Sequence, residues 1–274
     1  MSLYGTILGV TVGVGSVYEK MAILAASCFT KHTGIPAIVL GDSQFAASKL
    51  PHPAALRLKL FEYVSAETVV YFDADWFCLS DWKPLVPTEP RPLLACRDFI
   101  LKSESPDQHY EFESDNFHHT PNEGCREDFD LLRHDYINEI RSFAGITLSC
   151  WQWINSGLMI LRREPHVDLL NTALRLYLGQ VGHHPVYFEQ PAIIKAIECT
   201  QLPVHFLPRK FNVLAKHESK WPPSVVGLHV KIRRHSVFVQ KVESGVICST
   251  ASLEQHFLRP RASLGLEDGH RKIG

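Results

Sequence analysis

Two aspartates follow directly on a run of β-forming residues. The run covers residues 69–72 (VVYF), and Asp73 and Asp75 come next with one residue between them. Because alternate residues of an extended chain point to the same side, both carboxylates can bind one cation at the end of a buried strand. Two carboxylates with few other protein ligands are typical of Mg²⁺ or Mn²⁺ that also binds a substrate diphosphate. The pair predicts an enzyme that acts on a nucleotide diphosphate; the structural alternative is a pair of loop or helix-cap aspartates.

Other acidic and histidine motifs of the chain do not indicate a second metal site. Asp128 and Asp130 form another Asp-x-Asp, but no apolar run precedes them, which indicates surface charge. The pairs at residues 118–119 and 183–184 are both His-His, without the ligand spacing of a zinc site. We therefore place the expected metal at the first Asp-x-Asp.

The composition is that of an ordinary globular protein. The chain has 274 residues, of which 45% are hydrophobic and 21% charged, and its formal net charge is -1. This balance predicts a sizeable core and argues against broad adhesion to nucleic acid or membranes. No apolar run approaches the length of a membrane span, and no basic segment precedes the first apolar run as in a signal peptide. The seven cysteines are scattered without a C-x-x-C, so we expect free thiols and a cytoplasmic location, with peripheral attachment to a membrane left open.

Strands and helices alternate in the first part of the chain. Apolar runs predict strands over residues 7–12, 37–40 and 68–72, and helical spacing of apolar residues predicts helices over 17–29 and 54–64. This alternation indicates an α/β fold with a mainly parallel sheet flanked by helices. Ligands of such sheets bind beyond the carboxyl ends of the strands, where the two aspartates lie.

The later part of the chain is less regular. We predict strands over residues 93–96, 153–161 and 225–230, the second interrupted at 155–157, helices over 167–178 and 191–197, and a hairpin over 238–249. The polar segment 99–150 between these elements is long enough to be a binding insert. No repeat or low-complexity linker divides the chain, so we expect one domain over residues 1–274. The insert would lie on the acceptor side, where a second substrate would bind.

The order of several motifs resembles family 8 glycosyltransferases, which include glycogenin and bacterial lipooligosaccharide galactosyltransferases. Residues 57–64 (RLKLFEYV) and 69–75 (VVYFDAD) are similar to the helix, strand and Asp-x-Asp unit of that family. Four further segments follow in the family's order: 154–159 (INSGLM), 189–192 (EQPA), 207–212 (LPRKFN) and 227–229 (GLH). The resemblance implies a GT-A nucleotide-diphospho-sugar transferase fold and the retaining transfer of a hexose from a UDP-sugar, with Mn²⁺ or Mg²⁺.

The resemblance also implies roles for individual residues. The metal ligands would be Asp73, Asp75 and His229. The nucleotide would be bound near Ala74 and by Thr11, Val12 and Tyr18, the last three at the uracil. Around the donor sugar and diphosphate, the resemblance places Arg57, Asn155 and Gly157, Glu189 on a donor hydroxyl, Gln190 beneath the anomeric carbon, and Lys231 or Arg233 on the leaving diphosphate.

Three departures from the family pattern keep other functions open. Residues 15–17 (GSV) stand where relatives carry Asp or Asn just before the tyrosine, Glu189 replaces the usual Asp, and no Gly and Lys-Pro-Trp follow His229. The alternatives are an inverting GT-A transferase, a nucleotidyltransferase, or an inactive protein that binds sugar nucleotides. An inverting enzyme needs a carboxylate base near the acceptor, and the insert contains several.

Overall fold

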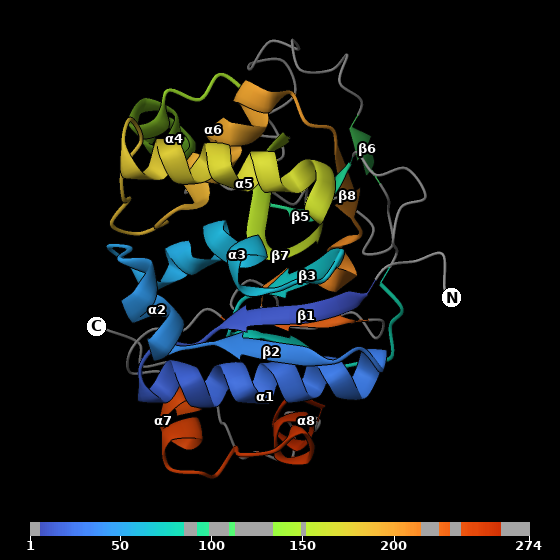
Figure 1. Ribbon diagram of the computed structural model, residues 1–274. Helices are drawn as coiled ribbons and strands as arrows, with labels where there is room; N and C mark the ends of the chain where they lie inside the picture. Colours follow the sequence, from blue (N-terminus) through green and yellow to red (C-terminus); the bar gives the residue numbers. More distant parts are fainter. Residues whose placement is uncertain are drawn as a thin grey trace, which may run out of the picture.

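In a computed structural model of the chain, the described residues are 6–84, 92–98, 110–112, 134–148, 152–214, 225–230 and 237–258. Within them, seven strands form one mixed sheet in the order β2-β1-β3-β7-β5-β8-β6 (Figure 1). Their bounds are β1 (Ile7–Val12), β2 (Ala37–Leu40), β3 (Thr68–Phe72), β5 (Leu93–Arg97), β6 (Tyr110–Phe112), β7 (Ile154–Arg162) and β8 (Val204–Leu207). A second, three-stranded sheet in the order β4-β10-β9 contains β4 (Trp76–Cys78), β9 (Val213–Leu214) and β10 (Gly227–His229).

The first half of the large sheet is parallel, as predicted. Strand β1 pairs in parallel with both β2 and β3, and all three have the predicted bounds. Strand β7 then pairs antiparallel with β3 and β5, while β5 and β8 are parallel and β6 runs against β8. The predicted mixed, mainly parallel α/β architecture is confirmed.

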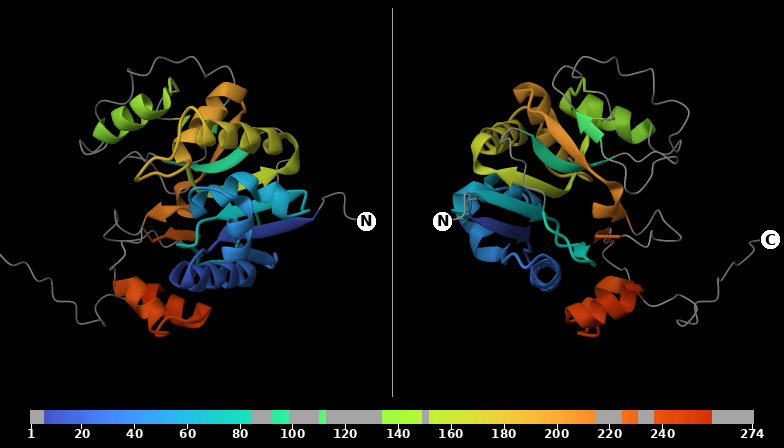
Figure 2. Two further views of the ribbon diagram at one scale, coloured as in Figure 1. Left: turned by 60° about the vertical axis from the view of Figure 1, so that its left-hand side comes forward. Right: turned by 90° about the vertical axis from the view of Figure 1, so that its right-hand side faces the viewer.

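Both faces of the large sheet are covered. Alternate residues of β3 belong to different core clusters: Val69 and Tyr71 face one side, and Val70 and Phe72 face the other. Helix α1 (Ser16–Thr33) covers the second side, and α7 (Val237–Glu243) and α8 (Thr250–Leu258) lie next to α1 (Figure 2). Because β3 is buried from both sides, its sequence is continuously apolar rather than alternating.

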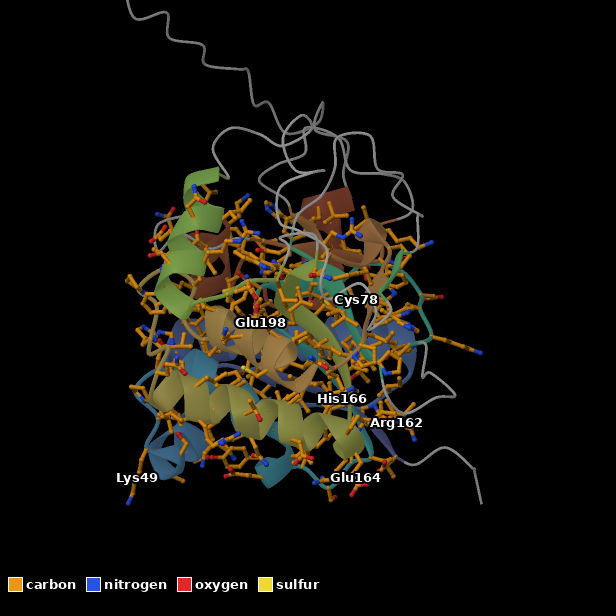
Figure 3. All side chains as sticks on the ribbon, turned by 90° about the horizontal axis from the view of Figure 1, so that it is seen from above. Lys49, Cys78, Arg162, Glu164, His166 and Glu198 are labelled. Atoms are coloured by element: carbon orange, nitrogen blue, oxygen red, sulfur yellow. The ribbon has the colours of Figure 1, made fainter. Side chains whose placement is uncertain are left out.

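The first side is covered by the remaining helices (Figure 1). Helix α5 (Arg163–Leu178) lies beside α6 (Gln190–Thr200), and α4 (His134–Ala144) packs against α6. Figure 3 shows where β7 passes into α5: the backbone N–H of Arg162 donates to the Nδ1 of the buried His166, at 2.7 Å. The predicted helices 167–178 and 191–197 are confirmed with longer bounds.

The segment predicted as a helix over residues 54–64 consists of two consecutive helices of different type. It begins as a 3-10 helix, η1 (Pro53–Lys59), and continues as α3 (Leu60–Tyr63). Residues 55–58 of η1 are all buried, so this segment lies inside the fold rather than on its surface. The short helix α2 (Asp42–Ser48) and the 3-10 turn η5 (Arg209–Phe211) were not predicted.

The break predicted at residues 155–157 is a bulge within one strand. Strand β7 pairs regularly with β3, but its pairing with β5 jumps from Ala95 opposite Met159 to Cys96 opposite Asn155. The extra residues of β7 bend this strand locally. The bulge therefore lies next to the ends of β3 and β5, where the sequence places the candidate site.

The predicted hairpin over residues 238–249 is wrong. This segment forms most of α7 and the turn that leads to α8, and Phe238, Val239 and Val242 are buried with helical spacing. Gly245 has a φ of 78° and follows α7, so the glycine read as a hairpin turn ends a helix. The Ser249 hydroxyl accepts the N–H of Ser252 at 3.2 Å, which caps α8.

The insert predicted over residues 99–150 is described only in part. Of the 99–150 insert, the described parts are 110–112 and 134–148, and Asp128 and Asp130 lie outside them. In the described part of the chain, none of the helices combines the length and the apolar character needed to cross a bilayer.

We predict that Glu198→Ala destabilises the protein by about 1–3 kcal/mol, because two backbone N–H groups lose their charged acceptor. Glu198, on α6 (Figure 3), accepts the N–H groups of Thr147 and Leu148 at 2.6 and 2.8 Å and also binds Lys195. Urea denaturation measures the change. The exposed Glu62→Ala serves as the control and should change stability by less than about 0.5 kcal/mol; equal effects of both substitutions would contradict the anchoring role.

We predict that the free energy of unfolding falls as the pH falls from about 6.5 to about 4. Burial, the neighbouring His183 and Arg57 lower the pKa of His52 to about 4. In this pH window the unfolded chain binds a proton that the folded chain does not, so acid favours unfolding. The Nδ1 of His52 accepts the N–H of Ala54 at 3.2 Å and thereby begins η1.

The measurement is urea denaturation at several pH values, for the wild type and for His52→Asn. Asparagine keeps an acceptor for this N–H but does not titrate, so the slope should become shallower. Some slope should remain, because burial also lowers the pKa of His184. An unchanged slope would exclude His52 as a source of the pH dependence.

Candidate functional site

The ends of three strands bring the predicted metal ligands together. Asp73 follows β3, and its N–H donates to the carbonyl of Gly157 in the β7 bulge at 2.9 Å. The chain then turns into β4, which pairs antiparallel with β10 so that His229 lies opposite Trp76. The N–H of Val230 also donates to the carbonyl of Asp75 at 2.8 Å. The small sheet therefore holds the histidine against the aspartates, although they are far apart in sequence.

The three side chains form a compact cluster. One ligand atom from each of Asp73, Asp75 and His229 lies within 4.8 Å of the others. The His229 Nε2 is 3.2 Å from the Oδ1 of Asp75 and 3.8 Å from the Oδ2 of Asp73. The imidazole is buried, while both carboxylates are partly exposed, so the cluster opens on one side toward solvent.

The tautomer of His229 matches a metal ligand. Its Nδ1 is 3.1 Å from the side-chain oxygen of Asn212, which accepts only, so Nδ1 carries the proton. The Nε2 lone pair then faces two carboxylates. This arrangement is repulsive unless a cation or a proton lies between them. Two carboxylates and one neutral imidazole suit a divalent cation such as Mn²⁺, and the residues therefore fit the metal that the sequence predicts.

The Asp73 carboxylate has a fixed orientation. Its Oδ1 accepts from the Tyr71 hydroxyl at 2.8 Å and from the Arg57 Nη2 at 2.8 Å. The Oδ2 of Asp73 is left for the cluster. Tyr71 and Arg57 therefore determine which oxygen of Asp73 a cation can reach.

Arg57 is buried and binds protein groups. The residue is 6% exposed; its Nε lies 2.7 Å from the Oε1 of Glu189, and its Nη1 donates to the carbonyl and hydroxyl of Ser156, both at 2.9 Å. Its guanidinium also lies over the Tyr71 ring, 4.7 Å from the centroid. Burial alone would lower the pKa of Arg57, but Asp73 and Glu189 outweigh it and raise this pKa. The guanidinium therefore connects the Asp-x-Asp motif to the start of α6.

Glu189 has one paired and one unpaired oxygen. The residue is 1% exposed, and among the described residues its Oε2 has no hydrogen-bond partner. Burial raises the pKa of Glu189, and the Arg57 charge opposes this shift. A buried carboxylate oxygen without a donor is unfavourable, so Oε2 is suited to accept from a ligand hydroxyl.

Gln190 and Asn155 share one carboxylate. The Nε2 of Gln190 donates to one oxygen of Asp98 at 3.3 Å, and the Nδ2 of Asn155 donates to the other at 3.1 Å. The Gln190 Oε1 accepts from the N–H and the hydroxyl of Ser156 at 3.2 and 3.1 Å. These contacts fix the orientation of both amides.

Gly157 makes room for the metal-site histidine. A Cβ at this position would lie 2.6 Å from the Cε1 of His229. The family resemblance places this glycine at the donor sugar and diphosphate. In the structure, the nearest group is the imidazole ring itself.

The remaining predicted residues lie at the end of β1, at the start of α1, between the two aspartates, or outside the described residues. Thr11 and Val12 end β1, next to the end of β3, and the buried Thr11 hydroxyl has no partner among the described residues. Tyr18 is 46% exposed in the first turn of α1, so it is not a core residue. Ala74 is buried between the aspartates. Lys231 and Arg233 lie outside the described residues.

Sequence reasoning missed the residues that orient the site. These are Tyr71, Asp98, Ser156 and Asn212. Ser156 and Asn212 lie within segments that resemble family motifs, so the motifs contain a signal for them. Tyr71 reads as an ordinary strand residue and Asp98 as a loop residue, since only their spatial partners reveal what they do.

Comparison with known proteins supports the architecture. No protein-family model and no curated protein sequence matches the chain. Among solved structures, it is similar to the WbbM bifunctional glycosyltransferase (TM-score 0.54, 11% identity, 93% of this chain and 52% of WbbM). It is also similar to the glycosyltransferase GlyE of Streptococcus pneumoniae TIGR4 (TM-score 0.52, 12% identity, 92% and 63%) and to the galactosyltransferase LgtC in complex with donor and acceptor sugar analogues (TM-score 0.50, 13% identity, 86% and 94%).

The chain thus spans about half of WbbM, less than two thirds of GlyE and nearly all of LgtC. At these identities the likeness concerns the fold. The chain has the GT-A glycosyltransferase fold, as the resemblance of its motifs implied.

Proposed function

We propose that this chain is a metal-dependent retaining glycosyltransferase of the family 8 type, which transfers a hexose from a UDP-sugar to an acceptor hydroxyl. The observation that carries the proposal is the cluster of Asp73, Asp75 and His229 at the strand ends of a GT-A fold. A GT-A fold alone leaves the reaction open, because function depends on the site. The cluster supplies the chemistry that a diphosphate leaving group requires.

Asp73, Asp75 and His229 would hold the divalent cation, Mn²⁺ in preference to Mg²⁺ because one ligand is a nitrogen. When bound, this ion offsets the negative charge that develops on the diphosphate as the glycosidic bond breaks. Lys231 or Arg233 would add positive charge to the same group.

The nucleotide would lie along the ends of β1 and β3, past Ala74. Two observations support a base-binding role for the end of β1. The buried Thr11 hydroxyl lacks a partner among the described residues, and the exposed Tyr18 ring is available for stacking on a base. The backbone of Val12, the last residue of β1, would pair with the base edge.

The donor sugar would lie between the cation cluster and the start of α6. The unpaired Oε2 of Glu189 is suited to accept a sugar hydroxyl, and the Asn155 amide is fixed nearby through Asp98. Glu189 is longer by one methylene than the Asp of the family pattern, so the preferred hexose can differ from that of relatives.

Retention of configuration follows best from attack on the front face. Gln190 is a poor nucleophile, and its Oε1 already accepts two hydrogen bonds from Ser156. In front-face transfer, the bond from the anomeric carbon to the UDP oxygen breaks while the acceptor oxygen bonds to the same face. The acceptor proton passes to the departing UDP oxygen. Gln190 and Glu189 would support the oxocarbenium-like sugar, and the acceptor would bind at the 99–150 insert.

In this scheme, Arg57 holds Asp73 and Glu189 in place rather than reaching the donor. The guanidinium is 6% exposed and is directed toward Asp73, Glu189 and Ser156. A buried charge with these partners is costly to redirect. Arg57 thus acts on the reaction through the two carboxylates that it fixes.

The alternatives differ in products that can be measured. An inverting enzyme gives the opposite anomer by NMR, and a nucleotidyltransferase releases pyrophosphate. An inactive sugar-nucleotide-binding protein shows a Mn²⁺-dependent thermal shift with UDP but no turnover.

We predict that Asp75→Asn lowers UDP-hexose turnover at least about 100-fold, because the cation loses a charged ligand. Transfer and hydrolysis of UDP-hexoses are measured with Mn²⁺, and circular dichroism checks the fold. The matched control is Asp168→Asn on the exposed surface of α5, which should retain full activity. Near wild-type turnover of a folded Asp75→Asn variant would refute the assignment of the metal site.

We predict that Gly157→Ala weakens Mn²⁺-dependent binding of UDP by at least about 10-fold. The added methyl group would lie 2.6 Å from the Cε1 of His229, so the ring must move away from the aspartates. Calorimetric titration of UDP with and without Mn²⁺ measures the effect. Gly41→Ala, whose new Cβ has only an ordinary contact at 3.7 Å, is the control. If Gly157→Ala binds UDP and Mn²⁺ as the wild type does, the position of His229 is not important for the metal.

A further inference from the structure

A five-residue turn leads directly into Glu189 and Gln190. The backbone groups of His184 and Phe188 exchange two hydrogen bonds, each 3.0 Å long. The Nδ1 of His184 also accepts the N–H groups of Val186 and Tyr187, both at 3.1 Å. Pro185 has no N–H, so these four contacts involve every backbone donor of the turn. The turn is therefore organised around the His184 ring.

The other ring nitrogen of His184 binds a different element. Because Nδ1 accepts, the proton of the neutral ring is on Nε2, which lies 3.2 Å from the Oε1 of Glu139 on α4. The ring also contacts Phe143 of α4 edge-to-face, with centroids 4.7 Å apart. His184 is 1% exposed, so its two nitrogens connect the turn to α4, which belongs to the 99–150 insert.

The turn places the residues that follow it. Phe188 has a φ of 53°, a left-handed conformation that a bulky residue adopts only when its surroundings impose it. The N–H of Gln190 donates to the carbonyl of Tyr187 at 3.0 Å, and the carbonyl of Glu189 accepts the first bonds of α6. A change in the turn would therefore rotate Glu189 away from Arg57 and Gln190 away from Asp98.

We propose that His184 is a positioning residue, which couples the acceptor-side helix α4 to Glu189 and Gln190. The proposal rests on the proposed function, because it deepens the account of the same site. Glu139 fixes the tautomer of the ring, the ring fixes the turn, and the turn fixes the two side chains. His184 belongs to the His-His pair at residues 183–184, which lacks the spacing of a zinc site, and it has a structural role beside the candidate site.

Three variants separate these links. His184→Asn keeps a side-chain oxygen that can accept the N–H groups two and three residues later, as asparagine does in turns, but it cannot reach Glu139. His184→Leu removes both contacts. Glu139→Ala removes the α4 partner and leaves the ring.

Two measurements are made on each variant of the full chain. Amide hydrogen exchange is followed at Val186, Tyr187 and Gln190, and UDP-hexose hydrolysis is measured with Mn²⁺. For His184→Leu, we expect exchange at these amides to be at least about 10-fold faster and kcat at least about 30-fold lower. KM for the donor should change less than kcat, because the nucleotide part of the donor site is untouched. His184→Asn should restore most of the protection and of kcat.

The coupling to α4 is tested by combining variants. Glu139→Ala should speed the exchange of the turn amides when His184 is present and have no effect in the His184→Asn background. Equal effects of Glu139→Ala in both backgrounds would overturn the coupling. Unchanged exchange and kcat in His184→Leu, or a failure of His184→Asn to restore them, would overturn the positioning role.

The two proposals can fail separately. If the wild type hydrolyses no UDP-hexose, the proposed function fails, while the exchange at Gln190 still decides whether His184 holds the turn and α6. If His184→Leu does not fold, the comparison of the wild type, His184→Asn and Glu139→Ala decides the coupling.

Discussion

The arrangement of the site depends on one buried arginine side chain. The Arg57 guanidinium lies between the carboxylates of Asp73 and Glu189, which come from the end of β3 and the start of α6. Removing a guanidinium from water is costly, and only close, well-oriented anions compensate for this cost. Because both carboxylates are needed, Arg57 connects the end of β3 to the start of α6. The same contact orients Asp73, and through Asp73 it determines the geometry of the cluster with Asp75 and His229.

Much of the fold could be predicted from the sequence because its central strands are buried on both faces. The bounds of β1, β2 and β3 were predicted without error, since continuous apolar runs between breaks leave few alternatives. The hairpin expected at 238–249 failed because a glycine turn fits a helix end as well as a hairpin. The short strands β4 and β9 gave no usable pattern, since two or three residues are too few to show a period.

The cluster of Asp73, Asp75 and His229 could be predicted from the sequence, but the contacts that orient it could not. The spacing of Asp73 and Asp75 indicated a cation, and the order of motifs brought in His229. The sequence suggested that Arg57 reaches the ligand, whereas the structure directs its donors to protein groups. Partners such as Asp98 and Asn212 are selected by the tertiary fold, and spacing along one chain does not reveal them.

The unpaired oxygen of Glu189 has a consequence for substrate discrimination. This oxygen is shielded from solvent in the folded chain, and among the described residues no donor reaches it. If a sugar hydroxyl occupies the position, a deoxy analogue that lacks it leaves a dehydrated anion without compensation. Such sites reject the poorer ligand by about 10⁴-fold or more, well beyond the worth of one ordinary hydrogen bond. Selectivity against deoxy-sugars would then be built into the apo protein before any donor arrives.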